Sequence, residues 1–391
     1  MRSSRGGDTS LCSPWVAGVV EERSMFLPAI PQASSSSSSS SFDPDAETLR
    51  SRLREVGSRC HKPFYAEGGN NAWGSHVNSL VFPLAYALSR NRTALSPSLG
   101  AYANGSCATF ACLFRPLASD ECEKNRRLRA CPPKKKLFSC PRRRRLLASG
   151  CEAEVECAVP SLRAAAMKKG EFSHAVRGAA ALPAAFQHRG HFWFVSQLLH
   201  WLLRPNELTR GLVRRRAAEI GLGAAVRRPL IGVHVRRGDS CRPTQEKKKA
   251  RRCTGFDDYW HHVVALKHRY AAKSVFLATD DAEVASAARN ASTLEFPVIV
   301  SSSHPVSWDA VLGKQEFLDR TRVLREIVTD IALLARSDAF VGKFTSNVDR
   351  IAYALLAARS NCLKPFVSLD SLWCHDWSNP VGRSIYGTFL C

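Results

Sequence analysis

Residues 230–239 of this 391-residue chain read Leu-Ile-Gly-Val-His-Val-Arg-Arg-Gly-Asp. The first six are mostly apolar and rich in β-branched residues, which is typical of a buried strand in a parallel sheet. Open α/β sheets bind ligands where such strands end, and here the strand ends in His234, Arg236, Arg237 and Asp239. Because an arginine fork pairs phosphate oxygens through two hydrogen bonds, two arginines favour a diphosphate. From these residues alone, a salt bridge between arginine and aspartate is an equally good interpretation.

The rest of the C-terminal half alternates strands and helices, which indicates an α/β domain with a parallel sheet. Further strands are expected at 274–279, 298–300 and 339–342. Helices are expected at 192–203, 207–220, 256–268, 281–291, 324–335 and 348–358. Asn206 is predicted to cap the helix over 207–220.

Polar residues follow two more of these strands. Asp280 and Asp281 follow the strand at 274–279, and Lys343, Thr345 and Ser346, with Phe344 between them, follow the strand at 339–342. Capping of the next helix is a sufficient explanation for each group taken alone. Asp330 lies among apolar residues of a predicted helix and needs a partner, because burying an unpaired charge is costly. The carboxyl ends of parallel strands meet at one sheet edge, so together these groups favour a site for a phosphorylated nucleotide.

Composition narrows the classes of function. The net charge is +22, but the basic residues lie in tracts beside proline or cysteine and read as solvated loops. Aromatic-interleaved basic surfaces, zinc-finger spacing and RNA-recognition signatures are all missing, so no nucleic acid partner is expected. Neither a P-loop nor a dinucleotide fingerprint is found. Asp43-Pro44-Asp45 resembles a metal motif, but it lies beside a serine tract, and no metal is assigned.

The fourteen cysteines indicate an oxidising compartment. Seven of them lie between Cys107 and Cys157 without any Cys-x-x-Cys pair, which favours disulfides over a metal site. Sequons at Asn91, Asn104 and Asn290 agree with the secretory pathway. No segment reaches the roughly 18 to 20 apolar residues that span a bilayer. No signal anchor is visible, and the start of the chain is expected to be incomplete or the protein soluble.

Three domains are expected. Residues 1–45, which include eight consecutive serines at 34–41, should form a disordered tail. Residues 46–205 should form an N-terminal α/β domain with basic, cysteine-rich insertions, and 206–391 a Rossmann-like domain. Within the N-terminal domain, the glycine-rich loop 68–74 feeds an apolar stretch at 77–88. It could offer backbone N–H groups to an anion, although a plain loop is the better interpretation of that loop by itself.

Three segments, taken in order, carry a family resemblance. They are 231–239 (Ile-Gly-Val-His-Val-Arg-Arg-Gly-Asp), 277–281 (Leu-Ala-Thr-Asp-Asp), and Asp330-Ile331 with 344–348 (Phe-Thr-Ser-Asn-Val). Their order and spacing resemble the α-1,6-fucosyltransferases, which include the core fucosyltransferase of N-glycans and the rhizobial Nod-factor enzymes. The resemblance is strong over 188–372 and weaker back to Gly68 and 113–116.

The resemblance implies an α/β fold of the GT-B type, with two Rossmann-like domains facing a cleft and the C-terminal half binding the nucleotide. It implies metal-independent, inverting transfer of fucose from GDP-fucose to a glycan hydroxyl, with α-1,6 transfer to the core GlcNAc of N-glycans as the expected case. No cofactor is expected besides this donor substrate. The implied acceptor is a glycan or glycoprotein, and the implied location is the Golgi lumen or secretory pathway, with membrane association only through an anchor not visible here.

The resemblance also assigns donor-binding residues. Arg236 would bind the β-phosphate and neutralise charge on the departing GDP, which a fixed guanidinium can do without a metal. His234 and Asp330 would contact the nucleoside, with the carboxylate pairing guanine donors, and Ser346 would hydrogen-bond phosphate. Arg237, Phe344, Thr345, Gly74 and Ser75 complete the donor-binding set, the last two from the opposite domain.

The catalytic base is where the sequence departs from the family. Inversion requires a base that takes the acceptor proton. The family has a lysine after the aspartate of the first motif and an acid a few residues later, whereas this chain has Ser240 and then Cys-Arg-Pro-Thr. Asp239, which would also organise the motif, or Glu246 is the expected base. Asp280 and Asp281 would shape the site or face the acceptor.

Two rival interpretations stay open. A protein O-fucosyltransferase-like enzyme shares an arginine at the first strand end, but Asp280, Asp281 and the surroundings of Asp330 argue against it. A non-catalytic glycan- or GDP-binding relative is suggested by the altered region after Asp239.

Overall fold

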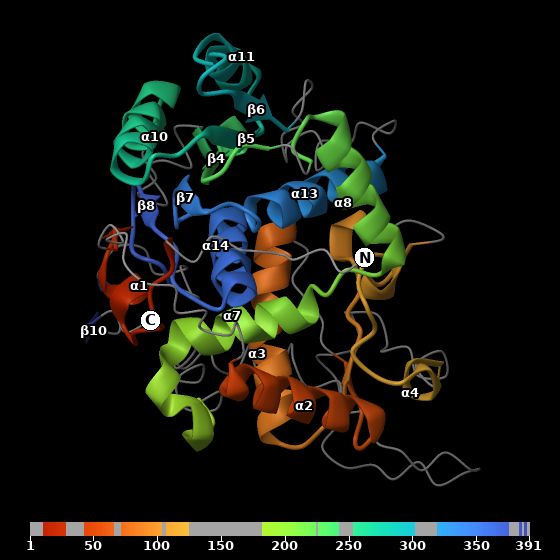
Figure 1. Ribbon diagram of the computed structural model, residues 1–391. Coiled ribbons are helices and arrows are strands. Elements are labelled where there is room, and N and C mark those ends of the chain that lie inside the picture. Colours follow the sequence, from red (N-terminus) through yellow and green to blue (C-terminus); the bar gives the residue numbers. More distant parts are fainter. Residues whose placement is uncertain are drawn as a thin grey trace, which may run out of the picture.

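The computed structural model describes residues 11–28, 43–65, 72–103, 107–124, 182–223, 226–241, 253–301 and 319–374, with two short strands near the C-terminus. Its centre is a six-stranded sheet in the order β1-β8-β7-β4-β5-β6 (Figure 1). The strands are β1 (Met25–Phe26), β4 (Leu230–Val235), β5 (Ser274–Thr279), β6 (Val298–Val300), β7 (Ala339–Gly342) and β8 (Phe366–Ser368). The four strands predicted from the sequence are thereby confirmed, and the α/β class with them.

Strand order places a topological switch point at the middle of the sheet. From β4 the chain adds the parallel strands β5 and β6 on one side, and then returns to add β7 and β8 in parallel on the other. The loops that follow β4 and β7 therefore lead in opposite directions from neighbouring strands. In open α/β sheets a ligand binds in the crevice that such divergence leaves.

Alternate residues of the strands enter two hydrophobic clusters, one on each face of the sheet. Val233, Leu277 and Val341 belong to the cluster that contains α10 (Phe256–Tyr270) and α11 (Ala282–Asn290). Phe276 and Phe340 belong to the cluster that contains α13 (Arg320–Leu334) and α14 (Asn347–Ser360). Burial on both faces explains why these strands read as continuous apolar runs in the sequence.

The predicted helices form, and polar side chains cap three of the six. Asp281 accepts hydrogen bonds from two backbone N–H groups of α11, and Asn206 caps α8 (Glu207–Glu219), as expected. Helix α13 starts four residues before its predicted beginning, because Asp319 caps it at Thr321 and Arg322. Such caps satisfy N–H groups that have no partner within the helix.

The N-terminal half is mainly helical in the part that the structure describes. It contains α2 (Pro44–Ser58), α3 (Trp73–Ser89), α4 (Asp120–Lys124) and α7 (Gly190–Leu202), with one parallel strand pair, β2 (Phe64–Tyr65) and β3 (Ala94–Leu95). Short 3-10 turns are η2 (Gly100–Tyr102), η3 (Phe110–Cys112), η6 (Ala184–Arg189) and η7 (Gly238–Cys241), and a hairpin joins β9 (Arg383–Ser384) and β10 (Gly387–Thr388).

The two halves share one hydrophobic core. Helix α7 packs against α14, where the Phe192 ring lies 5.6 Å from the Tyr353 ring and 4.7 Å from the Trp373 ring. Figure 1 shows α13 and α14 between the sheet and the helices α7 and α3. At the predicted boundary near residue 205 the chain turns from α7 into α8 (Glu207–Glu219), and the hydrophobic core is continuous across it.

Residues 11–28 differ from the expected disordered tail. They form α1 (Val19–Glu22) and β1, which pairs antiparallel with β8, Met25 opposite Val367. Leu11 and Val20 are buried, and a disulfide joins Cys12 to Cys362. A few apolar side chains and one covalent link order a segment whose composition gave no periodic signal.

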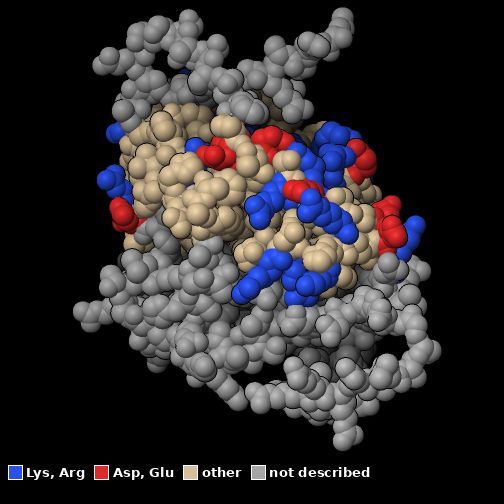
Figure 2. Space-filling view, turned by 90° about the horizontal axis from the view of Figure 1, so that it is seen from below, with Lys and Arg blue, Asp and Glu red and all other residues tan. Residues whose placement is uncertain are grey.

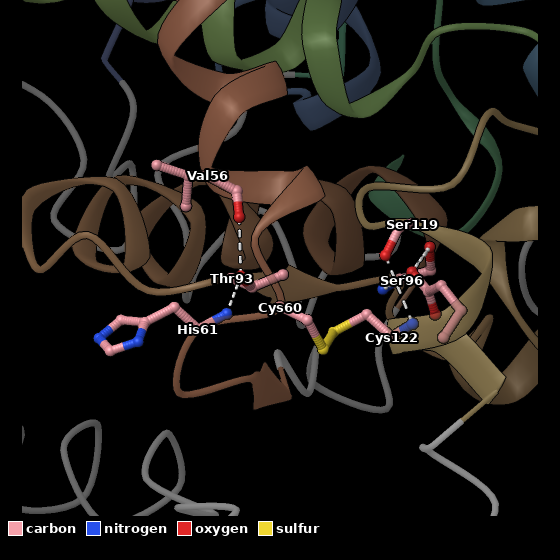
Figure 3. The surroundings of a disulfide bond; sticks show 8 residues. Val56, Cys60, His61, Thr93, Ser96, Ser119 and Cys122 are labelled. Carbon is pink, nitrogen blue, oxygen red and sulfur yellow. Dashed lines mark hydrogen bonds between the residues drawn. A yellow bond between two sulfur atoms is a disulfide. The ribbon is translucent and has the colours of Figure 1, made fainter.

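Disulfides are present, as the cysteine content predicted. Cys60 at the end of α2 is joined to Cys122 of α4 (Figure 3), and Cys241 is joined to Cys253 across the segment that follows β4. Beside the first of these, the Thr93 hydroxyl donates to the Val56 carbonyl and accepts from the His61 N–H. Within the predicted cysteine cluster, however, Cys107 is a buried free thiol.

Asp43, from the Asp-Pro-Asp motif, has a structural role. Its carboxylate caps α2 and accepts hydrogen bonds from Arg189 and from the Trp193 indole. Among the residues that the structure describes, no cluster of potential metal ligands occurs. Within the same residues, no helix combines the length and the apolarity that crossing a membrane requires.

Charge on the described surface is mixed. Figure 2 shows basic and acidic side chains next to one another on the face seen from below. On α2, Arg54 pairs with Glu47 and Arg59 pairs with Glu55.

The close approach of β4 to the turn after α13 gives a stability prediction. A Cβ at Gly232 would lie 2.5 Å from the Ser337 hydroxyl oxygen and 3.0 Å from its Cβ. Gly232→Ala should therefore lower the free energy of unfolding by about 1–3 kcal/mol, the usual cost of overpacking. The matched control is Gly255→Ala, because a Cβ at Gly255 meets nothing within 4 Å. Urea unfolding that found equal stability for the two variants would contradict this packing.

Candidate functional site

The site is built at the carboxyl ends of β4, β5 and β7. Register pairs Val235 with Thr279 and Val233 with Val341. The first residues beyond the three strands are therefore level with one another. The sheet brings three of the polar groups predicted from sequence to one edge, as expected from parallel strands.

Arg236 is held on two sides. Its Nη1 lies 3.5 Å from Asp280 Oδ2, and its Nε donates to the Ser240 hydroxyl at 3.1 Å. Asp280 is itself fixed, since its Oδ1 accepts from the Arg237 backbone N–H at 2.8 Å. The Arg236 side chain is still 21% exposed. A guanidinium oriented in this way can meet an anion from solvent with little further loss of side-chain entropy.

Arg237 and Asp281 make the salt bridge that was the alternative interpretation of the opening stretch. Arg237 Nη1 lies 3.5 Å from Asp281 Oδ2 and 3.8 Å from Glu283 Oε2. Asp281 also caps α11, so the role as a cap is confirmed for this residue. The two arginines thus differ, and Arg237 ties the loop after β4 to α11.

His234 forms a buried pair with Asp349, a residue to which the sequence assigned no role. His234 Nδ1 lies 2.7 Å from Asp349 Oδ2, and both side chains are buried. Burial by itself would lower the pKa of His234, but the charge and hydrogen bond of Asp349 raise it above its ordinary value. Asp349 Oδ1 also accepts the Lys343 N–H at 3.1 Å. A Cβ at Gly342 would lie 2.1 Å from that oxygen, so this turn requires glycine.

The loop after β7 presents Ser346 at the N-terminus of α14. Ser346 occupies the N-cap position but makes no side-chain cap, contrary to the simpler expectation. Its buried hydroxyl has no hydrogen-bond partner among the described residues. Thr345 instead bonds Asp370 through both its N–H and its hydroxyl, and burial raises the pKa of Asp370. An unused hydroxyl at a helix N-terminus suits an anion.

Phe344 corrects the predicted donor-binding set. Its side chain is buried in the core, with its ring 5.3 Å from the Phe366 ring and 5.7 Å from the Tyr353 ring. Its N–H donates to the Ser368 hydroxyl at 3.0 Å. Phe344 therefore anchors the loop through its buried ring.

Asp330 has the partner that its position required. It accepts a hydrogen bond from the Ser301 hydroxyl just beyond β6, and Arg216 of α8 donates to the Ser301 carbonyl. Burial raises the pKa of Asp330 to about 6, although the Ser301 hydrogen bond acts in the opposite direction. Asp330 is thus largely ionised only above about pH 6.

Gly74 and Ser75 lie where α3 meets α14. A Cβ at Gly74 would lie 2.7 Å from the Asn347 Cβ, so only glycine allows this approach. Asn347 Nδ2 donates to the Ser75 hydroxyl at 2.6 Å, and Asn78 donates to Asn347 Oδ1 at 2.6 Å. The N-terminal half therefore touches the same loop that carries Ser346.

Several predicted positions lie outside the described residues. They are Glu246, the Asp239 side chain and the glycine-rich loop before Ala72. Conversely, the sequence predicted no role for Asp349 or Asp370, which accept hydrogen bonds from the backbone just beyond the end of β7. An acidic residue in the first turn of a helix is an ordinary complement to the helix dipole. Nothing in the local sequence therefore indicates that the Asp349 side chain bonds His234 of β4.

The raised pKa of Asp330 predicts a stability cost at neutral pH. Its ordinary pKa is 3.8 and its folded-state pKa is about 6, so the folded state binds the proton more tightly and stability falls as pH rises between them. Asp330→Asn should raise the free energy of unfolding at pH 7.5 by up to about 3 kcal/mol, and the gain should vanish near pH 4. Asp319→Asn, which retains a capping oxygen, is the control. Urea unfolding that shows a pH-independent difference would contradict the assignment.

The comparisons with known proteins identify a family for the segment that contains this site. Residues 182–374 match the family described as alpha-(1,6)-fucosyltransferase N- and catalytic domains. An alpha-(1,6)-fucosyltransferase of Drosophila melanogaster is 30% identical over 200 residues, which is 49% of this chain and 30% of that protein. The chain thus spans less than a third of the length of this relative.

Solved structures of fucosyltransferases give weaker matches. NodZ from Bradyrhizobium has a TM-score of 0.45 at 16% identity, covering 75% of this chain and 92% of that one. POFUT1 in complex with GDP-fucose has a TM-score of 0.42 at 16% identity, covering 80% and 97%.

The family match agrees with the α/β class of the sheet and with the GT-B type expected for it. It spans the ends of β4, β5 and β7, and so includes every site residue of the C-terminal half described above. Residues 182–374, just under half of the chain, are similar to the alpha-(1,6)-fucosyltransferase family of glycosyltransferases.

Proposed function

We propose that the chain transfers fucose from GDP-fucose to a glycan hydroxyl. The observation that carries the proposal is the pair of anion-binding features at the switch point of the sheet. One is the Arg236 guanidinium after β4, and the other is the uncapped N-terminus of α14 with its unpartnered Ser346 hydroxyl. Both follow neighbouring strands, where a doubly wound sheet binds nucleotides.

The chemistry of the reaction explains why these groups suit it. When fucose leaves GDP, negative charge develops on the diphosphate. A fixed guanidinium and oriented backbone N–H groups stabilise that charge without reorganising, and this is a large contribution in a water-poor site. The transfer proposed here is inverting and metal-independent, and the proposed base is Asp239 or Glu246.

Nucleoside recognition is assigned to His234 and Asp330. An ionised Asp330 can accept hydrogen bonds from guanine N–H groups, which fits its place on α13 beside Ser301, the residue that follows β6. Gly74 and Ser75 would approach the donor from the other half, because they contact the loop of Ser346 through Asn347. Asp280 would shape the site by fixing Arg236.

The proposed acceptor is the core GlcNAc of an N-glycan, with an α-1,6 linkage, in the Golgi lumen. The family match supports the linkage, and the disulfides at Cys12, Cys60 and Cys241 support an oxidising compartment. A second candidate is a relative that binds GDP-fucose without transferring it. This second candidate is favoured by Ser240, which stands at the position where the family has a lysine. In this chain the Ser240 hydroxyl accepts a hydrogen bond from Arg236.

Removal of the guanidinium is the first test of the proposal. Arg236→Ala should reduce fucose transfer by at least about 100-fold, because the leaving group loses its main positive partner. Arg236→Lys should recover only part of the activity, since an ammonium cannot form the fork. Transfer is measured with GDP-fucose and an N-glycan acceptor, and Arg322→Ala on the exposed face of α13 is the control.

Isothermal titration with GDP separates the candidates. Retention of full activity by Arg236→Ala would overturn the assignment of that residue. An unmodified chain that binds no GDP would remove both candidate functions, and binding without transfer to any glycan would favour the non-catalytic relative.

Ser346 provides a second test that separates binding from folding. Ser346→Ala should weaken GDP binding roughly tenfold, the worth of a hydrogen bond to a charged group. It should leave the unfolding free energy unchanged, because the hydroxyl neither caps α14 nor bonds another described residue. The control is Ser58→Ala on α2, whose hydroxyl bonds the Glu55 carbonyl. Unchanged GDP affinity in Ser346→Ala would show that this hydroxyl does not meet the phosphate.

A further inference from the structure

The His234 ring is surrounded by charged groups from every element packed around it. Asp349 of α14 bonds it directly, and the carboxylate of Asp280 after β5 also favours its protonated form. Arg236, just after the same strand, opposes protonation of His234. Asp330 of α13 lies close enough that the His234 charge favours its ionised form. Tyr259 of α10 is buried beside Asp349 and Asp280, and its pKa is raised by burial and by those acids.

Three constraints hold the Asp349 carboxylate in place. Its Oδ1 is fixed by the Lys343 N–H, and the carboxylate fits only because Gly342 has no Cβ. It also lies in the first turn of α14, where the helix dipole favours negative charge. The second oxygen, Oδ2, is thereby left to face His234 Nδ1 at 2.7 Å. A carboxylate fixed on one side in this way determines which nitrogen of the imidazole must carry a proton.

We propose that Asp349 is a positioning residue for nucleotide binding, which holds His234 through Nδ1 in its doubly protonated form and so makes Nε2 a hydrogen-bond donor toward a guanine nucleotide. The proposal rests on the function proposed above. Neutral imidazole with its proton on Nδ1 presents only an acceptor at Nε2. Guanine O6 and N7 and the phosphate oxygens are acceptors, so only the protonated ring matches them.

The pairing also gives His234 and Asp330 complementary roles. Asp330 as a carboxylate accepts hydrogen bonds, whereas protonated His234 donates them. Guanine carries an acceptor at position 6 where adenine carries a donor. A donor fixed at His234 and an acceptor fixed at Asp330 would therefore favour guanine over adenine, and Asp349 would contribute to that choice without touching the ligand.

The test compares GDP affinity between the unmodified chain and Asp349→Asn from pH 5 to pH 8. Asparagine can still accept from Nδ1 but does not stabilise the imidazolium, so the variant should bind GDP roughly tenfold more weakly at pH 7.5. The ratio of the two affinities should narrow as pH falls, because acid then supplies the missing proton. Titration of Asp330 contributes to the affinity of both proteins. A ratio that stays constant with pH would overturn the proposal.

A matched control is available at the opposite end of β4. Asp338 is also buried and paired, with its oxygens 2.8 and 2.9 Å from Arg228 Nη1. Asp338→Asn should lower stability and leave the GDP affinity ratio independent of pH. If this variant showed the same pH dependence as Asp349→Asn, the effect would be general loss of packing and the proposal would fail.

A direct titration keeps the proposal testable if Asp349→Asn does not fold. The His234 imidazole resonance, assigned by its loss in His234→Gln, is followed by NMR against pH in the unmodified chain. The ring is expected to remain protonated at pH 7.5, and a ring that is already neutral at that pH would overturn the proposal. If the unmodified chain bound no GDP at all, the proposed function would fail, and the titration would still decide whether Asp349 charges His234.

Discussion

Burial of ionised side chains at one edge of the sheet is the constraint on which the rest of the site depends. Removing a charge from water costs several kcal/mol unless a partner is fixed beside it. Here the partners come from neighbouring strands or the helix that follows: Asp280 for Arg236, and Asp349 for His234. The alignment of the parallel strands is therefore also the alignment of the charges. A shift of one residue would separate every pair.

The two hydrophobic clusters make this arrangement possible. Helices α10 and α11 cover one face of the sheet, and α13 and α14 cover the other. The second cluster continues through α7 and α3 into the N-terminal half, so the loop of Ser346 is backed by packed helices on both sides. Because the surrounding helices are packed, the sheet edge can hold polar groups in unfavourable environments. Ser346 lacks a partner among the described residues, and Asp330 carries a raised pKa, both at some cost in stability.

The sequence predicted the part of the fold that periodicity encodes. Long apolar runs identified β4, β5 and β7, and the polar residues that end them identified Arg236, Asp280 and Ser346. Periodicity does not reveal β1 or the ordered structure of residues 11–28. Both depend on the disulfide to Cys362 and on a sheet edge that is formed by residues distant in the chain. The burial of the Phe344 ring could not be predicted, because a motif gives position without side-chain direction. Asp349 was overlooked because its partner lies more than a hundred residues away in the chain.

The central claim is that the switch point between β4 and β7 binds a guanosine diphosphate. An experimental structure of the chain with GDP measures this most directly. The account predicts that the diphosphate lies between the Arg236 guanidinium and the N-terminus of α14, with the Ser346 hydroxyl donating to a phosphate oxygen and the guanine beside Asp330. A nucleotide bound elsewhere, or at this edge with its phosphates remote from Arg236, would contradict it.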